Sequence, residues 1–144
     1  MILDSHQHVW DLNAADYPWL GPQHHPINRT IELSEAHSRM AAFGVERTIL
    51  VQAADNAAET QHLLRVADGD PRVAGVIGWV PLDQPSITTA MLASRDRRWV
   101  GVRSLIHDRP NDDWILGCDE GLAAVAQAGL PLDYVTNGPD ALRH

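Results

Sequence analysis

Two histidines separated by one residue, His6 and His8, stand at the end of the short apolar run that opens the chain. Alternate side chains of a β-strand point to the same face, so both imidazoles would project the same way, with Asp4 behind them. Two such imidazoles can hold one divalent cation, each nitrogen roughly 2.1 Å from it. The same spacing also occurs in hydrogen-bonded surface pairs. The position of this pair, at the end of a first strand, favours metal binding.

Other polar and aromatic residues stand near the ends of later predicted strands. Arg103 lies in an otherwise apolar strand, where a buried guanidinium needs a carboxylate partner. That partner is either a substrate carboxylate, bound bidentately, or Asp133 on the next strand, and we favour the substrate. Gln52, Trp79 and His107 are further candidates for substrate binding, although a tryptophan at such a position is commonly part of the packing.

The first strand is followed by residues 12–29. This stretch is predicted to be irregular, because its prolines and glycines forbid a helix or a central strand. Long loops of this kind are often functional, so the stretch is either a pocket wall or lid, or a packed surface loop. Its aromatic anchors are Trp10, Tyr17 and Trp19, and the first and last of these would build an apolar wall. The histidines expected to face solvent are His24, His25 and His37.

The elements that must position these residues alternate between strand and helix. Residues 1–8 begin with Met1, Ile2 and Leu3 as a buried strand, and residues 48–52, 73–80, 99–106 and 130–135 are the later predicted strands. Several of these runs are apolar on both faces, which is typical of a covered, parallel sheet. A loop with Pro110 follows the fourth strand, and Asn137, Gly138 and Pro139 break the chain after the fifth.

Four helices are predicted between the strands. The first is amphipathic, with an apolar face formed by Leu33, Ala36, Met40 and Phe43. Ser34 is placed to cap its start and Gly44 to end it. The second begins at Asn56 with Glu59 at capping-box spacing, buries Thr60, Leu63, Leu64 and Ala67, and closes at Asp70. The third covers residues 85–94, and the fourth ends at Gly129. Asp112 and Asp113 are expected to cap a helix.

Strict alternation of strand and helix indicates an α/β fold with right-handed crossovers. A doubly wound sheet and a (β/α)8 barrel both fit this order. The first strand-to-helix turn lacks a Gly-x-Gly-x-x-Gly motif, which argues against a dinucleotide-binding domain. Paired histidines at the end of a first strand favour the barrel, where catalytic groups sit at the C-terminal ends of the strands. No linker divides residues 1–144.

Composition excludes several classes of function. The chain has 144 residues and a net charge of −8, and each of its 11 cationic side chains is arginine. Without a basic stripe it is not expected to bind nucleic acid, and without lysine it forms no Schiff base or P-loop. It contains no apolar run long enough for a membrane span and no leader, so we expect a cytoplasmic protein. Cys118 is the single cysteine, expected to be a reduced, partly buried thiol.

Several segments together resemble the amidohydrolase-related family, in the branch of L-fucono-lactonase-like and 2-pyrone-4,6-dicarboxylate lactonase-like enzymes. The segments that carry the resemblance are Leu3–Asp11, Tyr17–Leu20, Gly44–Gln52, Glu59–Thr60, Gly75–Val80, Gly101–Arg103 and Asp113–Trp114. They follow the order of the family and span nearly the whole chain.

The resemblance implies a (β/α)8 barrel of the metal-dependent hydrolase fold that hydrolyses a lactone, a small cyclic ester carrying a carboxylate. His6 and His8 match the first-strand ligands of one divalent metal, Zn or Mn, although some lactonases of this branch work without a metal, and no organic cofactor is implied. Arg103 matches an arginine that holds a substrate carboxylate.

Family members continue for about as long again, with an essential histidine on a later strand and an aspartate on the last strand. A complete barrel needs around 250 residues. We therefore expect residues 1–144 to be the N-terminal portion of one barrel domain, about five βα units. We expect this portion to contain no catalytic residue of its own and to be inactive alone.

Two alternatives stay open at the level of sequence. The same scaffold could support a decarboxylase or another C–O or C–N hydrolase. Alternatively, the chain is a non-catalytic fragment that self-associates through its open barrel edge, because unpaired edges of apolar strands template association.

Overall fold

The computed structural model describes residues 1–109 and 111–136. In this part of the chain five strands alternate with four α-helices, as the sequence predicts. The strands are β1 (Ile2–Gln7), β2 (Val45–Val51), β3 (Val73–Gly78), β4 (Trp99–Leu105) and β5 (Leu132–Val135), and the helices are α1 (His37–Ala42), α2 (Ala57–Gly69), α3 (Pro85–Ala93) and α4 (Asp119–Gln127). The predicted breaks at Pro110 and at Asn137, Gly138 and Pro139 lie outside the described residues.

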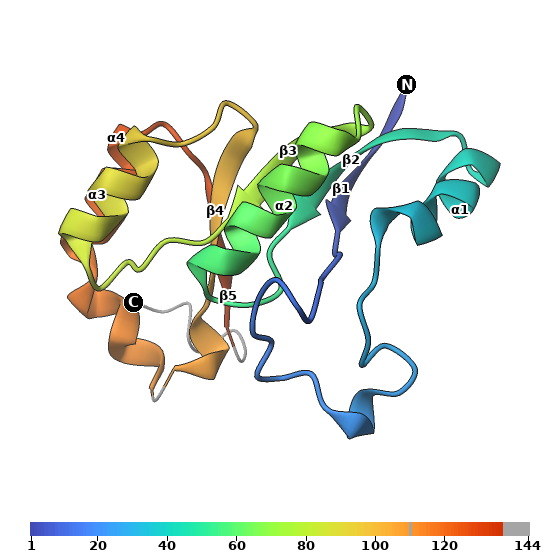
Figure 1. The fold of residues 1–144 in the computed structure, drawn as a ribbon. Helices are drawn as coiled ribbons and strands as arrows, with labels where there is room; N and C mark the ends of the chain where they lie inside the picture. Colours follow the sequence, from blue (N-terminus) through green and yellow to red (C-terminus); the bar gives the residue numbers. More distant parts are fainter. Residues whose placement is uncertain (110, 137–144) are drawn as a thin grey trace.

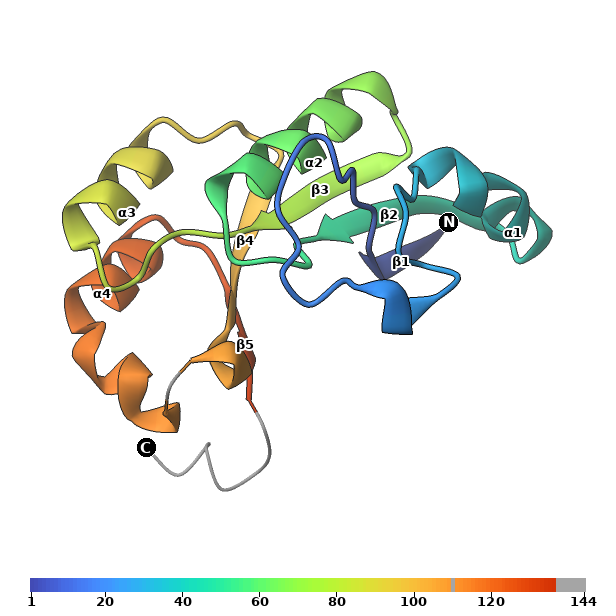
Figure 2. The ribbon, with the colours of Figure 1, turned by 60° about the horizontal axis from the view of Figure 1, so that its bottom comes forward.

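The strands form one parallel sheet in the order β1-β2-β3-β4-β5. This order never reverses, whereas the strand order of a doubly wound sheet does. The sheet curls into a half-barrel, with α2 over β3 and with α3 and α4 side by side beyond β4 (Figures 1 and 2). The fold is therefore a partial TIM-type α/β barrel, and all five strands end at the same mouth.

The main core lies between the sheet and the helices. Leu50, Val76 and Val102 from the strands and Leu63 from α2 are completely buried, and each such side chain contributes roughly 1.5–3 kcal/mol of burial free energy. The predicted buried face of α2 is confirmed. Its predicted cap is confirmed too, because Asn56 Oδ1 accepts a hydrogen bond of 2.8 Å from the Glu59 N–H.

A smaller apolar cluster holds the segment after β1 against the end of β2. Trp10, Tyr17 and Ala54 are buried there, and Trp19 packs beside them. Backbone hydrogen bonds pair Trp10 with Ile31 in both directions, at 3.1 and 2.9 Å, and close the segment at its base. Apart from a short 3₁₀ turn at Pro22–His24, the segment is irregular, as predicted.

The prediction that β1 begins as a buried strand is wrong. Met1, Ile2 and Leu3 are 84%, 55% and 38% exposed. β1 pairs with β2 alone, so within the described residues it is an edge strand with one flank uncovered.

The predicted helix over residues 33–43 also differs from the structure. A 3₁₀ turn at Leu33–Ala36 precedes α1, and the Ser34 hydroxyl donates to Glu32 Oε2 instead of capping the helix. Phe43 follows α1 directly and is 77% exposed; the 3₁₀ turn at residues 33–36 has a tighter period than an α-helix, so Leu33 and Phe43 do not share one face. Gly44 ends the helix as predicted, with φ of 68°.

Two of the histidines expected in solvent are half-buried. His37 Nε2 lies 3.0 Å from Asp70 Oδ2, and the ring of His24 packs edge-on against Trp19. His25 is exposed, as predicted. His24 is half-buried because the irregular segment folds back on itself, whereas His37 begins α1 and reaches Asp70 at the end of α2.

Two features near α4 also differ from the predictions. The two predicted aspartates do begin a helix, the 3₁₀ helix Asp112–Gly117, but Asn111 and not an aspartate occupies the cap position, without a side-chain cap hydrogen bond. Cys118 is free, and it is fully instead of partly buried. Within the described residues, no helix is long and apolar enough to cross a membrane.

Candidate active site

His6 and His8 project to the same side of the half-barrel. Their Nε2 atoms are 3.1 Å apart and the two rings meet edge to face, at an interplanar angle of 81°. His8 Nδ1 lies 2.8 Å from the Val51 carbonyl at the end of β2. Because a carbonyl can only accept, Nδ1 carries the proton and Nε2 of the neutral ring keeps its lone pair.

This geometry fits a shared cation. Nitrogens 3.1 Å apart, each roughly 2.1 Å from one ion, would subtend an angle of roughly 95° at that ion. The carbonyl that fixes the tautomer of His8 is the usual outer partner of a metal-binding imidazole. Burial is the main cause that lowers the pKa of His8, and the neighbouring His6 and Arg103 lower it further. His8 therefore favours the neutral form that a metal needs.

The part of the chain that the structure describes contains no cluster of three or more histidine, cysteine or acidic side chains able to hold a metal. Asp4 does not join the pair, because its Oδ1 accepts a hydrogen bond of 3.0 Å from the backbone N–H of His6. Two imidazoles alone make up less than the three protein ligands of a usual catalytic zinc site.

Arg103 reaches the same mouth from β4. Its Nη1 lies 3.4 Å from His6 Nε2 and 3.3 Å from the Gln52 carbonyl. Its Nε lies 3.3 Å from Asp133 Oδ2, in register on β5. Of the two partners that the sequence leaves open for Arg103, Asp133 is thus in contact with it.

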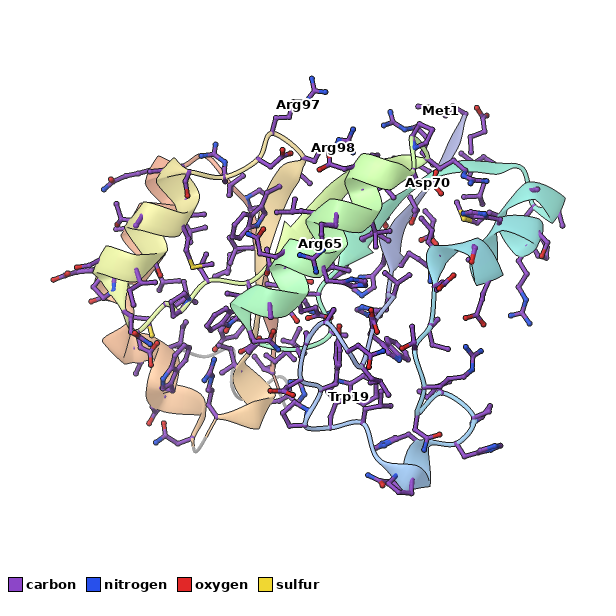
Figure 3. All side chains as sticks on the ribbon, viewed as in Figure 1. Met1, Trp19, Arg65, Asp70, Arg97 and Arg98 are labelled. Carbon is purple, nitrogen blue, oxygen red and sulfur yellow. The ribbon has the colours of Figure 1, made fainter. Side chains whose placement is uncertain are left out.

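A cavity of about 380 Å³ opens beside His8 and Arg103. Its other lining residues are Trp10, Trp19, Ile27, Ala53, Leu105 and His107. The Trp19 indole N–H donates a hydrogen bond of 2.8 Å to the Ala53 carbonyl, which holds this wall against the end of β2. Figure 3 places Trp19 at the opposite end of the molecule from Met1, Arg97 and Arg98. The cavity therefore lies at the C-terminal mouth of the strands, and the irregular segment forms one of its walls.

Gln52 is fully buried at the end of β2. Its amide nitrogen donates to Asp55 Oδ1 at 3.0 Å and to the Arg103 carbonyl at 3.2 Å, while its Oε1 is buried without a hydrogen-bond partner. Asp55 in turn accepts from the Leu105 N–H at 3.1 Å and from Arg109 Nη2 at 2.7 Å. Gln52 and Asp55 thus tie the end of β2 to the end of β4, below the cavity.

The other two predicted residues, His107 and Trp79, differ in their relation to the cavity. His107 lines the cavity from the short 3₁₀ turn after β4. Trp79 follows β3, and its backbone N–H donates to Thr60 Oγ1 at 2.9 Å; it does not line the cavity.

Glu59 is a buried residue that the sequence does not single out as part of the site. Its carboxylate accepts backbone N–H hydrogen bonds from Ala53, at 2.9 and 3.0 Å, and from Ala54, at 2.7 Å. Burial raises its pKa to about 7, against the lowering effect of these N–H groups. Glu59 therefore fixes the turn that carries Ala53 into the cavity wall.

Asp55, Glu59 and Arg109 are the residues near the mouth that sequence reasoning missed. Their partners are backbone groups or residues far along the chain, for which spacing gives no signal. One available signal was the place of Glu59 four residues before Leu63, on the buried face of α2.

Two curated proteins that resemble this chain in sequence carry the same name. A protein from Burkholderia ambifaria named L-fucono-1,5-lactonase is 34% identical over 116 residues, which are 78% of this chain and 39% of the relative. One from Burkholderia multivorans with the same name is 35% identical over 106 residues, 74% of this chain and 36% of the relative. The chain thus spans little more than a third of the length of these relatives.

Solved structures show the same fold. An amidohydrolase from Burkholderia multivorans with bound Zn matches with a TM-score of 0.84 and 29% identity, over 94% of this chain and 49% of that one. A probable 2-pyrone-4,6-dicarboxylic acid hydrolase from Acinetobacter baumannii, with citric acid bound, matches with a TM-score of 0.68 and 15% identity, over 92% of this chain and 48% of that one. The sequence profile of the amidohydrolases matches residues 3–142, and the chain belongs to this family.

Proposed function

We propose that this chain supplies the first-strand histidine pair and one substrate wall of a lactone-hydrolysing amidohydrolase. The observation that carries the proposal is the convergence of His6 and His8 Nε2, 3.1 Å apart at the C-terminal mouth of the strands. The curated relatives named L-fucono-1,5-lactonase support a cyclic ester as the substrate. The zinc in the Burkholderia multivorans structure supports a divalent metal.

The residues of the chain have distinct parts in this proposal. His6 and His8 would hold the cation, and the Val51 carbonyl keeps His8 Nε2 available for it. When bound, a divalent cation polarises an ester carbonyl and acidifies water. Trp10 and Trp19 would shield one side of the lactone ring from solvent, because both line the cavity next to His8.

A complete reaction needs more groups than the described residues bring together. A general base must take the proton of the attacking water, and a third ligand must complete the cation site. The resemblance to the family implies that these are a later-strand histidine and a last-strand aspartate. We therefore propose that the 144 residues on their own bind metal weakly and do not hydrolyse lactones.

A cytoplasmic location suits the buried, free thiol of Cys118.

Zinc titration followed by calorimetry tests the first step. His6→Ala and His8→Ala should each weaken Zn²⁺ binding roughly tenfold or more, since each removes one of two ligands. The matched control is His25→Ala, because His25 is exposed and distant from the pair in sequence. Equal zinc affinity of wild type and both site variants would show that the pair is not a metal site.

Lactone hydrolysis, followed by acid release with added Zn²⁺ or Mn²⁺, tests the second step. The purified chain should show no hydrolysis above the buffer rate. Hydrolysis that disappears in His6→Ala would overturn the proposed inactivity while supporting the site.

Self-association is a second candidate for what the chain does alone. Within the described residues one edge of β1 has unpaired backbone groups, and Ile2 and Leu3 on this strand are exposed; an apolar strand with such an edge invites pairing with another strand. We propose that a second copy covers this edge.

A further inference from the structure

Arg103 is the cation that lines the cavity, and its charge is already compensated within the chain. Asp133 Oδ2 lies 3.3 Å from Arg103 Nε, an ion-pair contact without a hydrogen bond, and the arginine side chain is 13% exposed against 37% for the aspartate. The pair joins registered residues of β4 and β5, so both side chains leave the sheet on the same face. We propose that Asp133 is a specificity-determining residue: its pairing with Arg103 makes the cavity favour uncharged lactones over lactones that carry a carboxylate.

The next guanidinium along the chain is compensated in the same way. Arg109 Nη2 lies 2.7 Å from Asp55 Oδ2, and its guanidinium carbon stacks 4.3 Å from the Trp114 ring centroid. Asp55 also accepts the Leu105 N–H, so this pair is fixed to the cavity wall. Arg103, which lines the cavity, and Arg109, which lies behind the lining residue Leu105, are therefore each in contact with a carboxylate.

An incoming carboxylate would have to compete with Asp133 for Arg103. Displacing Asp133 leaves a carboxylate beside the ligand's own negative charge, and like charges at short range repel strongly where water is partly excluded. An uncharged lactone meets no such repulsion. It finds instead an aromatic wall, Trp10 and Trp19, with rings edge to face and centroids 5.5 Å apart.

The test compares two ligands of the same shape, one with a charged carboxylate and one with a neutral carboxamide, and it rests on the proposed function because both probe the lactone cavity. The probes are γ-butyrolactone-γ-carboxylate and γ-butyrolactone-γ-carboxamide, titrated into the metal-free chain and followed by amide NMR shifts. The wild type should bind the carboxamide at least as tightly as the carboxylate. Asp133→Asn should shift the affinity ratio toward the carboxylate by roughly tenfold, because Arg103 becomes available for an anion.

A matched control removes another arginine–aspartate pair with the same change in net charge. Asp68 Oδ1 lies 3.2 Å from Arg98 Nη1, and Arg98 lies at the opposite end of the molecule from Trp19 (Figure 3). Asp68→Asn should leave the ratio unchanged. Adding Arg103→Met to Asp133→Asn should abolish the gain, and Asp133→Ser serves if the asparagine variant unfolds.

The outcomes separate this inference from the proposed function. If both probes bind but Asp133→Asn does not change their affinity ratio, or Asp68→Asn changes it equally, the inference is wrong and the lactone cavity stands. If neither probe shifts the amide signals of cavity residues in any variant, both the inference and the proposed lactone site are wrong.

Discussion

Glu59 carries a completely buried carboxyl group, and the pKa shift that burial causes should make the stability of the chain depend on pH. Burial raises its pKa in the folded chain from an ordinary 4.5 to about 7. Between these pH values the folded chain keeps a proton that the unfolded chain has lost. The stabilisation from this group is thus full below pH 4.5 and is lost as pH rises toward 7.

Glu59→Gln should remove this dependence. The free energy of unfolding of the wild type should fall by about 3 kcal/mol more than that of the variant between pH 4.5 and pH 7. Urea unfolding at several pH values measures the difference. Glu120→Gln, at an exposed position of α4, is the control and should follow the wild type. Parallel curves for wild type and Glu59→Gln would mean that Glu59 titrates normally.

Sequence reasoning found the histidine pair but not its support, for a physical reason. An alternating pair on a strand is visible in the spacing of His6 and His8, because strand geometry fixes which face they share. The carboxylates of Asp55 and Glu59 act on backbone N–H groups of Leu105, Ala53 and Ala54. Every residue except proline has such a group, so the types of the donor residues give no sign of these contacts.

At the scale of elements, helix α4 approaches the turn after β3 through a glycine. A Cβ at Gly121 would overlap the backbone carbonyl of Leu82, which cannot move aside like a flexible side chain. Gly121→Ala should therefore lower the free energy of unfolding by about 2 to 3 kcal/mol. Urea unfolding against the wild type measures the loss.

Gly69→Ala provides the control for that substitution. Gly69 is the last residue of α2, and a Cβ there meets no atom within 4 Å. This variant should be unchanged or more stable by about 0.5 kcal/mol, since alanine restricts the unfolded chain. A similar loss of stability in both variants would show that the contact of α4 with Leu82 is not what Gly121 protects.

The elements were predictable where one physical signal dominated. Strands β2, β3 and β4 are apolar on both faces, and α2 has both a cap and a periodic buried face, so their positions were confirmed within a few residues. Phe43 fits the helical period of residues 33–43 but is exposed, because the regular helix is only His37–Ala42. Periodicity predicts which residues would share a helix face, but it does not show how many of them the regular helix includes.

At the scale of the whole molecule, the exposed edge of β1 should control the oligomeric state. We expect the wild type to associate as concentration rises, and Ile2→Lys to stay monomeric, because a charge on an edge strand opposes pairing. Size-exclusion chromatography with light scattering measures the molar mass. Leu12→Lys is the control, since Leu12 is 46% exposed but lies outside the strand edge. A wild type that is monomeric at every concentration would contradict self-association.

The hydrogen-bonded pairing of Trp10 with Ile31 has a consequence for how this scaffold can diversify. It closes the intervening segment at its base, and Tyr17 and Trp19 anchor this segment to the end of β2. A change at the tip, Pro22–His24, would therefore cost the contact of His24 with Trp19 and the entropy of closing a different loop. His6 and His8 precede this pairing in the chain. Trp10 is part of the pairing, and Trp19 lies in the segment that it closes. Changes in this segment would therefore reshape the aromatic wall of the cavity and leave His6 and His8 in place.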